Sequence, residues 1–340
     1  MKRVLLAADV GGTKANLALV EQDGESLRRL RDSEFRTPEF ANLVDLARSF
    51  VGPDGPRIES ACLGVPGPVR EGKAKGTNLP WSIDAEEVRT ALGIPRLVLV
   101  NDLLATGHGI GELPADRLAV LQLGRPQPQG AKVLIAAGTG LGEAFLFWDG
   151  RRHIPCPSEG GHADFAPREA VEVDLLRHLA ERFGHVSAER VVSGPGLQNI
   201  FRFLVETGRA ADSPRVRERM EREDASHVIS DEALAGTDRA CAEALEIFVR
   251  AYGAEAGNLA LKALATGGVY VGGGIAPKIL PKLREGPFLE AFRDKGRLAP
   301  LLAEIPVFVI LDPKAALYGA IRLAAEAPED GASAPGPAGG

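Results

Sequence analysis

The sequence predicts an α/β protein built from two lobes, and three observations support this prediction. At 340 residues the chain is long for a single hydrophobic core. A strand, a glycine-threonine loop and a second strand occur together twice, which indicates an internal repeat. A short apolar run, Leu97–Val100, stops abruptly at Asn101-Asp102. Such a run is typical of a strand buried on both faces, and ligands bind beyond the carboxyl ends of these strands in open sheets.

The composition is that of an ordinary globular protein, with 45% hydrophobic and 25% charged residues. A net charge of −6 argues against nucleic-acid binding as the main activity, since that activity requires a basic face. Cys62, Cys156 and Cys241 are far apart and lack the spacing of a zinc site or a disulfide framework. No apolar segment is long enough for a membrane span or a signal peptide, so we expect a cytoplasmic protein without a membrane partner.

The first repeat lies near the N-terminus. Val4–Ala8 is predicted to be a strand, Asp9–Thr13 a turn and Ala15–Val20 a second strand. The two adjacent glycines of the turn allow consecutive backbone N–H groups to face an anion, and Asp9 suits a Mg²⁺ that accompanies such an anion. A plain tight hairpin has the same Gly-Gly pair, and on these residues alone both interpretations stay open.

The second repeat has the same layout. Lys132–Ala137 and Glu143–Trp148 are predicted strands joined by the glycine-threonine loop Gly138–Gly142. Two such loops facing each other would clamp a polyphosphate from both sides. A third glycine segment, Gly267–Gly274, ends a strand ahead of a helix that begins near Lys278, and it would let a flat ring approach the backbone. A simple helix-entry loop has the same composition.

Asp102 has two interpretations of its own. It delivers a carboxylate to the edge of the sheet where ligands bind, or it caps the helix predicted in the next segment, 103–113. Both uses of Asp are common at a junction between a strand and a helix. The residues around Asp102 do not decide between them.

Other polar segments lie between these glycine loops. Ser158–Pro167 places Glu159 and His162 among glycines without a helical period, although a solvated loop with a structural histidine would look the same. In Val186–Leu197 we predict a helix with Ser187 as its N-cap and Glu189 in its first turn, where the helix dipole favours a carboxylate. The remaining assignments are a strand running into a Pro/Gly loop at Ala61–Val69, an irregular segment at Thr77–Trp81, and scaffold helices at Glu169–Phe183, Asp238–Leu264 and Lys314–Ala325.

These motifs occur in one order over nearly the whole chain. They are DVGGT at Asp9–Thr13, VND at Val100–Asp102, GTGLG at Gly138–Gly142, EGGHADFAP from Glu159, SAERVVSGPGL from Ser187 and GGGI from Gly272. In this combination the sequence resembles the bacterial glucokinases, in the hexokinase-like branch of the sugar kinase, actin and heat-shock chaperone superfamily. The resemblance implies a duplicated actin-like ATPase (ribonuclease H-like) fold, with two α/β lobes and a central cleft.

The resemblance also implies boundaries and an activity. The small lobe would comprise residues 1–112 and 306–326 and the large lobe residues 113–305, while the Pro/Gly-rich composition of 327–340 predicts a disordered tail. The implied activity is the ATP-dependent phosphorylation of D-glucose to glucose 6-phosphate, which enters glycolysis. ATP and Mg²⁺ would be the cofactors, and the protein would be a cytoplasmic homodimer with no nucleic-acid partner.

The family's site residues carry over by position. Asp102 would be the catalytic base, and Asp9 would hold Mg²⁺ with ATP. The implied sugar contacts are Asn78, Asn101, Asp102, Glu159, His162 and Glu189. The implied ATP contacts are Ala8, Asp9, Val10, Gly11, Gly12, Thr13, Gly138, Thr139, Gly140, Gly272, Gly273 and Gly274. This chemistry is consistent, because carboxylates accept hydrogen bonds from sugar hydroxyls and phosphoryl transfer needs Mg²⁺ and a proton acceptor.

Two alternatives to a glucokinase remain at this stage. The same parts would serve a kinase for another hexose, such as mannose, fructose or an amino sugar, or a sugar sensor that does not catalyse. Lys14 also gives the GGTK string of the related ROK sugar kinases and repressors. The sequence lacks the CxCGxxGC zinc motif of that branch, so we expect no stoichiometric zinc.

Overall fold

The computed structural model describes residues 2–75, 79 and 81–326. Asn78 and the predicted tail, 327–340, lie outside the described residues, so their predictions stay untested. The chain divides into two compact units. The first comprises Met1–Pro114 and Asp312–Gly340, and the second comprises Ala115–Leu311.

The first unit contains a five-stranded sheet with the order β3-β2-β1-β4-β8. Its strands are β1 (Arg3–Val10), β2 (Lys14–Asp23), β3 (Ser26–Arg36), β4 (Ser60–Val65) and β8 (Arg96–Asn101). The first three form an antiparallel meander, whereas β1, β4 and β8 run parallel, so β1 and β8 end at the same edge of the sheet. A small second sheet consists of β5 (Val69–Arg70), β6 (Lys73–Lys75) and β7 (Ser82–Asp84).

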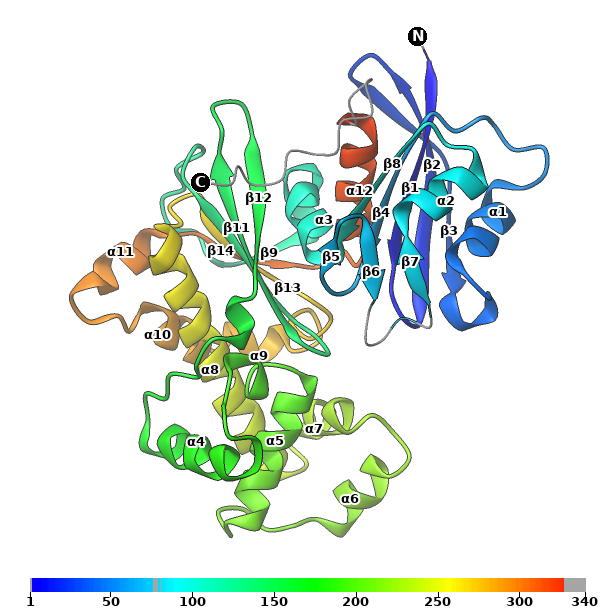
Figure 1. Cartoon of the computed structure of the whole chain (residues 1–340). Coiled ribbons are helices and arrows are strands. Elements are labelled where there is room, and N and C mark those ends of the chain that lie inside the picture. Colours follow the sequence, from blue (N-terminus) through cyan, green and yellow to red (C-terminus); the bar gives the residue numbers. More distant parts are fainter. Residues whose placement is uncertain (1, 76–78, 80, 327–340) are drawn as a thin grey trace. The chain divides into compact units, whose positions relative to one another are not determined.

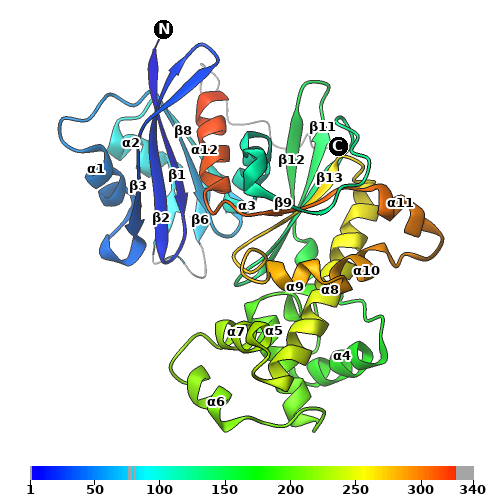
Figure 2. The same ribbon diagram turned by 180° about the vertical axis from the view of Figure 1, so that it is seen from behind.

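Helices cover both faces of this sheet because its strands are apolar on both sides. Leu6 and Ala8 of β1 pack in one cluster with α1 (Leu43–Val51) and α2 (Ala85–Leu92). Leu5 and Ala7 face the opposite way, toward α3 (Asp102–Gly109) and α12 (Ala315–Glu326) (Figures 1 and 2). The 3-10 helices of this unit are η1 (Thr37–Glu39) and η2 (Ile110–Glu112).

The second unit repeats this plan with a six-stranded sheet of order β12-β11-β10-β13-β14-β9. Its strands are β9 (Leu118–Gln122), β10 (Lys132–Ala137), β11 (Leu141–Trp148), β12 (His153–Ser158), β13 (Gly268–Gly272) and β14 (Val307–Ile310). Strands β10, β11 and β12 form an antiparallel meander, and β10, β13 and β14 run parallel. The predicted repeat is therefore confirmed, and each glycine-threonine loop joins the first two strands of a meander.

The core of the second unit is organised around α8 (Arg239–Ala263), a helix of 25 residues. The other helices are α4 (Ala170–Phe183), α5 (Gly194–Glu206), α6 (Pro214–Met220), α7 (Ala225–Ala235), α9 (Leu280–Arg284), α10 (Pro287–Arg293) and α11 (Ala299–Glu304). The 3-10 helices are η3 (Ala115–Arg117), η4 (Gly160–His162), η5 (Ala188–Arg190) and η6 (Gly296–Leu298). In the part of the chain with described coordinates, no helix has the length and apolar character to cross a membrane.

Three predicted boundaries differ from the structure. Strand β14 pairs with β13 and β9 in the second unit, so the chain returns to the first unit at Asp312 and not at 306. The helix predicted from Ser187 is only the 3-10 turn η5, because Ser187 makes no capping bond and the α-helix begins after Ser193. The helix predicted near Lys278 begins at Leu280.

Candidate active site

Asp102 is the first residue of α3, at the end of β8. The N-cap of α3 is Asn101, whose Oδ1 accepts hydrogen bonds from the backbone N–H groups of Leu103 (2.9 Å) and Leu104 (3.3 Å). The Asn101 amide also donates to the carbonyl oxygen of Gly67 at 2.9 Å. The residue that caps α3 is therefore Asn101 and not Asp102. Asp102 itself accepts one bond, from the Leu103 N–H at 2.8 Å.

The surroundings of Asp102 suit a proton acceptor. Desolvation raises the pKa of Asp102 above its ordinary value, although the backbone N–H groups of Leu103 and Asp102 and the Asn101 side chain oppose the shift. An aspartate with a raised pKa is a stronger base than one in water. Gly64 of β4 lies beneath this position, and a Cβ there would be 3.9 Å from the Cα of Asp102.

Asp9 lies on β1, in register with Asn16 of β2 and Gly64 of β4. Burial and, to a lesser extent, the negative charge of Asp102 raise the pKa of Asp9 to about 7, although a hydrogen bond with the Asn16 side chain opposes the shift. The charge of Asp102 raises the pKa of Asp9, so the fold of the first unit brings these two predicted site residues close together. A cation at Asp9 would favour its ionised form, so the carboxylate fits a hard metal ion such as Mg²⁺.

The loop after Asp9 is the hairpin Gly11–Thr13. The Gly11 N–H donates to the Lys14 carbonyl at 2.8 Å. Thr37, which is fully buried, holds the loop from η1: its hydroxyl donates to the Gly11 carbonyl at 2.7 Å and its N–H to the Thr13 carbonyl at 3.1 Å. Thr37 has no recognisable signal in the sequence, because its role depends on a contact with a distant part of the chain.

The second loop, Gly138–Gly140, lies at the corresponding place between β10 and β11. The Gly138 N–H donates to the Gly140 carbonyl at 2.8 Å, and the Gly138 carbonyl accepts from Gly194 at 2.8 Å. A Cβ on Gly138 would meet no atom within 4 Å, so its surface is open to a ligand. The Tyr252 hydroxyl of α8 accepts a bond from the Ala137 N–H at 3.2 Å, directly before the loop.

The third glycine segment packs against this second loop. Gly273 has a φ of +81°, and a Cβ there would collide with the Ala137 backbone. Gly272 is buried in β13 near Leu134. Of the described glycines at 272–274, Gly274 alone would have no atom within 4 Å of an added Cβ. The glycines at 272 and 273 are therefore explained by packing, and Gly274 is left as the member able to approach a ligand.

The predicted sugar contacts of the second unit are brought together by two adjacent turns. Glu159 precedes η4 and His162 ends it, and both are exposed. Residues that follow η4 pair with residues at the start of η5: the Ala188 N–H donates to the Ala163 carbonyl and the Phe165 N–H to the Val186 carbonyl, both at 2.9 Å. This pairing holds η5, and with it Glu189, beside η4.

Glu189 has a contact that the sequence did not predict. Its Oε2 accepts a hydrogen bond from the Leu141 N–H at 2.8 Å, directly after the second loop, and a Cβ on Gly140 would lie 2.5 Å from that oxygen. Ser193 fixes the same turn, since its hydroxyl donates to the Glu189 carbonyl at 2.7 Å and caps α5 through Gly196. One oxygen of Glu189 thus supports the loop, and the other is available to a ligand.

Two predicted ATP contacts have side chains that point away from any ligand. Ala8 and Val10 are fully buried in the core of the first unit, where they pack with α1. Only their backbone is left for a contact. Among the described residues, no group of three or more His, Cys, Asp and Glu side chains is arranged to hold a metal ion.

Comparisons with known proteins identify the family that the chain matches. The sequence matches the family described as glucokinase over residues 6–327. It is 44% identical over 337 residues to the glucokinase of Nostoc punctiforme, a match that covers 95% of this chain and 99% of the relative. The crystal structure of a glucokinase from an Antarctic psychrotroph superposes with a TM-score of 0.83 at 28% identity, over 95% of this chain and 99% of that one.

The ROK branch is structurally more distant. A ROK family glucokinase from Streptomyces griseus, solved with glucose and AMPPNP, has a TM-score of 0.62 at 23% identity and covers 95% of this chain and 99% of its own. At this identity the likeness concerns the fold alone. The two branches share the duplicated sheet, and the higher TM-score lies with the psychrotroph enzyme.

Proposed function

Because the chain belongs to the glucokinase family and phosphorylates glucose, we propose that Asp102 is the general base of this reaction. The observation that carries the proposal is that two adjacent residues at the end of β8 have different roles. Asn101 caps α3 with both ends of its amide engaged, and Asp102 keeps a desolvated carboxylate that accepts the Leu103 N–H at 2.8 Å. A carboxylate without a structural task is free to accept a proton.

The proposed step balances without any further reactant. ATP supplies the γ-phosphoryl group. The Asp102 carboxylate accepts the proton of the sugar 6-hydroxyl as that oxygen bonds to the γ-phosphorus, and the bond from this phosphorus to the bridging oxygen of ADP breaks. The raised pKa of Asp102 strengthens it as a base, because the proton is held more firmly at neutral pH than by an aspartate in water.

Sugar binding is assigned to the second unit's turns. Glu159, His162 and the unengaged oxygen of Glu189 would bind sugar hydroxyls, since each carboxylate oxygen accepts charge-assisted hydrogen bonds. Asn101, whose amide donates to Gly67 and also interacts with the Asp102 carboxylate, would be the sugar-binding neighbour of the base. The backbone N–H groups of the two glycine-threonine loops would bind the phosphates of ATP.

Magnesium binding is the finer part of the proposal. Asp9 is a desolvated carboxylate next to the charge of Asp102, and a divalent cation would relieve both effects. When bound, Mg²⁺ would neutralise negative charge on the ATP phosphates.

We also propose that the protein acts as a cytoplasmic homodimer, as its family resemblance implies. Light scattering coupled to size-exclusion chromatography would measure its mass in solution.

One assay separates this proposal from its alternatives. ADP release is followed with glucose, mannose, fructose and glucosamine, each with ATP and Mg²⁺ and again after addition of EDTA. We expect the highest kcat/KM with glucose, and loss of turnover in EDTA that Mg²⁺ restores but Zn²⁺ does not. Preference for another hexose would assign the pocket to that sugar. Sugar binding by calorimetry without ADP release from any hexose would indicate a sensor.

A further inference from the structure

Glu143 is, among the described residues, the buried carboxyl group whose oxygens both lack a hydrogen-bond partner. It lies on β11 with 1% of its surface exposed, and neither of its carboxyl oxygens has a hydrogen-bond partner among the described residues. A buried carboxyl group without a partner destabilises a fold by a large desolvation penalty. Such a group in a catalytic unit is therefore a candidate for a functional role.

The place of Glu143 is directly beneath the turn that presents Glu159 and His162. Glu143 is opposite Ser158 in the pairing of β11 with β12, and the Ser158 hydroxyl accepts a bond from the Gly160 N–H at 2.9 Å. A Cβ added to Gly160 would collide with Oε2 of Glu143. The backbone of the turn therefore rests on the Glu143 carboxyl group with no space between them.

The neighbouring residues of β11 make similar contacts. A Cβ on Gly161 would collide with the Leu141 carbonyl oxygen, while the Leu141 N–H donates to Glu189. Residues 141–143 are thus the base on which both turns with predicted sugar contacts lie. The same three residues follow directly after the loop Gly138–Gly140, so one short strand segment supports the sugar side and the phosphate side of the site.

We propose that Glu143 is a positioning residue for the sugar-binding turn, Glu159–His162, and that its protonated form holds this turn in the binding conformation. The inference rests on the proposed function, in which this turn contacts glucose. A neutral carboxyl group fills the space under Gly160 without requiring a counter-ion. A charged one would have to draw in water or move, and the turn above it is the part free to shift, since Glu159 and His162 are exposed.

The groups around Glu143 favour its neutral form. Burial and, to a lesser extent, the like charge of Glu255 on α8 together raise the pKa of Glu143 to about 7, and the positive charge of Lys262 opposes the shift only partly. Lys262 lies 3.7 Å from Glu255, which also accepts a bond from Asn258 at 2.9 Å. The other groups packed near Glu143 are the Ser158 hydroxyl on β12, the Gly160 backbone of η4 and the buried Tyr252 hydroxyl of α8.

Calorimetric titration of glucose from about pH 5.5 to about pH 8.5 tests this inference on the full-length protein. For the wild type we expect the Kd for glucose to rise roughly fivefold or more across pH 7, the low end of ordinary coupling between sites. Glu143→Gln, which is neutral at every pH and nearly the same size, should have a flat profile at the tight-binding value. Glu143→Ala should bind weakly at every pH, and both variants should keep kcat within a few-fold at saturating glucose.

Glu172→Gln is the matched control, because Glu172 is also buried in this unit but caps the start of α4. It should retain the wild-type pH profile. Gly160→Ala adds a second arm: it should raise the Kd strongly in the wild type and much less when combined with Glu143→Ala, which removes the collision. Additive effects of the two substitutions, or a Glu143→Gln profile that follows the wild type, would overturn the inference.

Glu159→Gln separates this inference from the proposed function. If Glu159→Gln weakens glucose binding and the Glu143 series does not alter it, the turn binds sugar but Glu143 does not position it. If Glu159→Gln leaves glucose binding unchanged, the turn does not bind glucose, and the proposed function is wrong at this point together with the inference that depends on it.

Discussion

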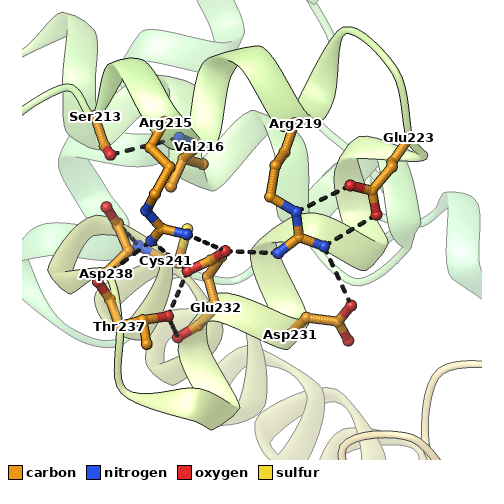
Figure 3. Close-up of polar contacts among 10 residues, drawn as sticks. All are labelled: Ser213, Arg215, Val216, Arg219, Glu223, Asp231, Glu232, Thr237, Asp238 and Cys241. Atoms are coloured by element: carbon orange, nitrogen blue, oxygen red, sulfur yellow. Dashed lines mark hydrogen bonds and ion pairs between the residues drawn. The ribbon is translucent and has the colours of Figure 1, made fainter.

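Glu232 and Glu143 are buried to nearly the same extent in the same unit, with 3% and 1% of their surfaces exposed, yet their surroundings are opposite. Glu232 on α7 accepts hydrogen bonds from Arg219 at 2.6 Å and from Arg215 and Thr237 (Figure 3). These contacts, with Arg215 first, lower the pKa of Glu232 to about 2. Glu143 has no such partner, and its pKa is raised to about 7.

The difference shows what each region does with a buried charge. Between α6 and α7 the carboxylate is fully paired, so it links the two helices through Arg215 and Arg219. Asp9 and Asp102 of the first unit and Glu143 of the second are instead desolvated with few hydrogen-bond partners or none, at a cost in stability. We infer that the paired carboxylate serves the fold and the unpaired ones serve the reaction, and four substitutions test this division.

The largest effect is expected for Asp102→Asn. The amide keeps the shape of the side chain and cannot accept the proton, so kcat should fall by about 10²–10⁴-fold, the range for a lost general base. The Kd for glucose should stay close to the wild-type value, and the melting temperature should not fall, because the amide removes a desolvated charge. Steady-state kinetics and calorimetry measure the two quantities, and Asp54→Asn on the surface is the control. Turnover near the wild-type rate would return Asp102 to a structural role.

Asp9→Asn should lower activity and raise stability, whereas replacing a structural carboxylate should lower stability and leave activity unchanged. The pKa of Asp9 is raised from 3.8 to about 7, so the folded state binds more protons than the unfolded state between these values. Wild-type stability therefore falls as the pH rises from about 4 to about 7. In EDTA at pH 8 the substitution should recover up to roughly 4 kcal/mol by this linkage. Urea unfolding measures it, and a loss of stability at pH 8 would show that Asp9 supports the fold.

Glu232→Gln should have the reverse signature, with lower stability and unchanged kcat and KM. Removing the charge leaves Arg215 and Arg219 short of an acceptor, and because both arginines reach solvent we expect a loss of about 1–3 kcal/mol at pH 7. The pKa of Glu232 is lowered from 4.5 to about 2, so its contribution is present above pH 4.5 and is lost as the pH falls toward 2. The variant should lack this part of the acid unfolding profile. An altered KM for glucose would join this region to the active site.

These contrasts could be predicted from the sequence only in part. The strands, the two glycine loops and the positions of Asp9 and Asp102 follow from local signals, namely short apolar runs that end at Gly, Asn or Asp. The capping role of Asn101 could not be separated from that of Asp102, because the residues are adjacent and both types cap helices. Glu143 has no local signal in the sequence. Its burial depends on the pairing of β11 with Ser158 and on the close approach of Gly160 to its carboxyl group, and both arise only in the folded chain.

The smallest effect is expected for Glu223→Gln, which tests whether burial or pairing alone makes a carboxylate structural. Glu223 accepts two hydrogen bonds from Arg219, both at 3.0 Å, so both of its carboxylate oxygens are paired, as those of Glu232 are (Figure 3). Its side chain is 49% exposed, however, and water replaces a lost partner at an exposed site. The melting temperature should therefore change by less than about 1 °C. If differential scanning calorimetry instead finds Glu223→Gln as destabilising as Glu232→Gln, the arginine network itself is what stabilises this region, and burial of Glu232 adds nothing to it.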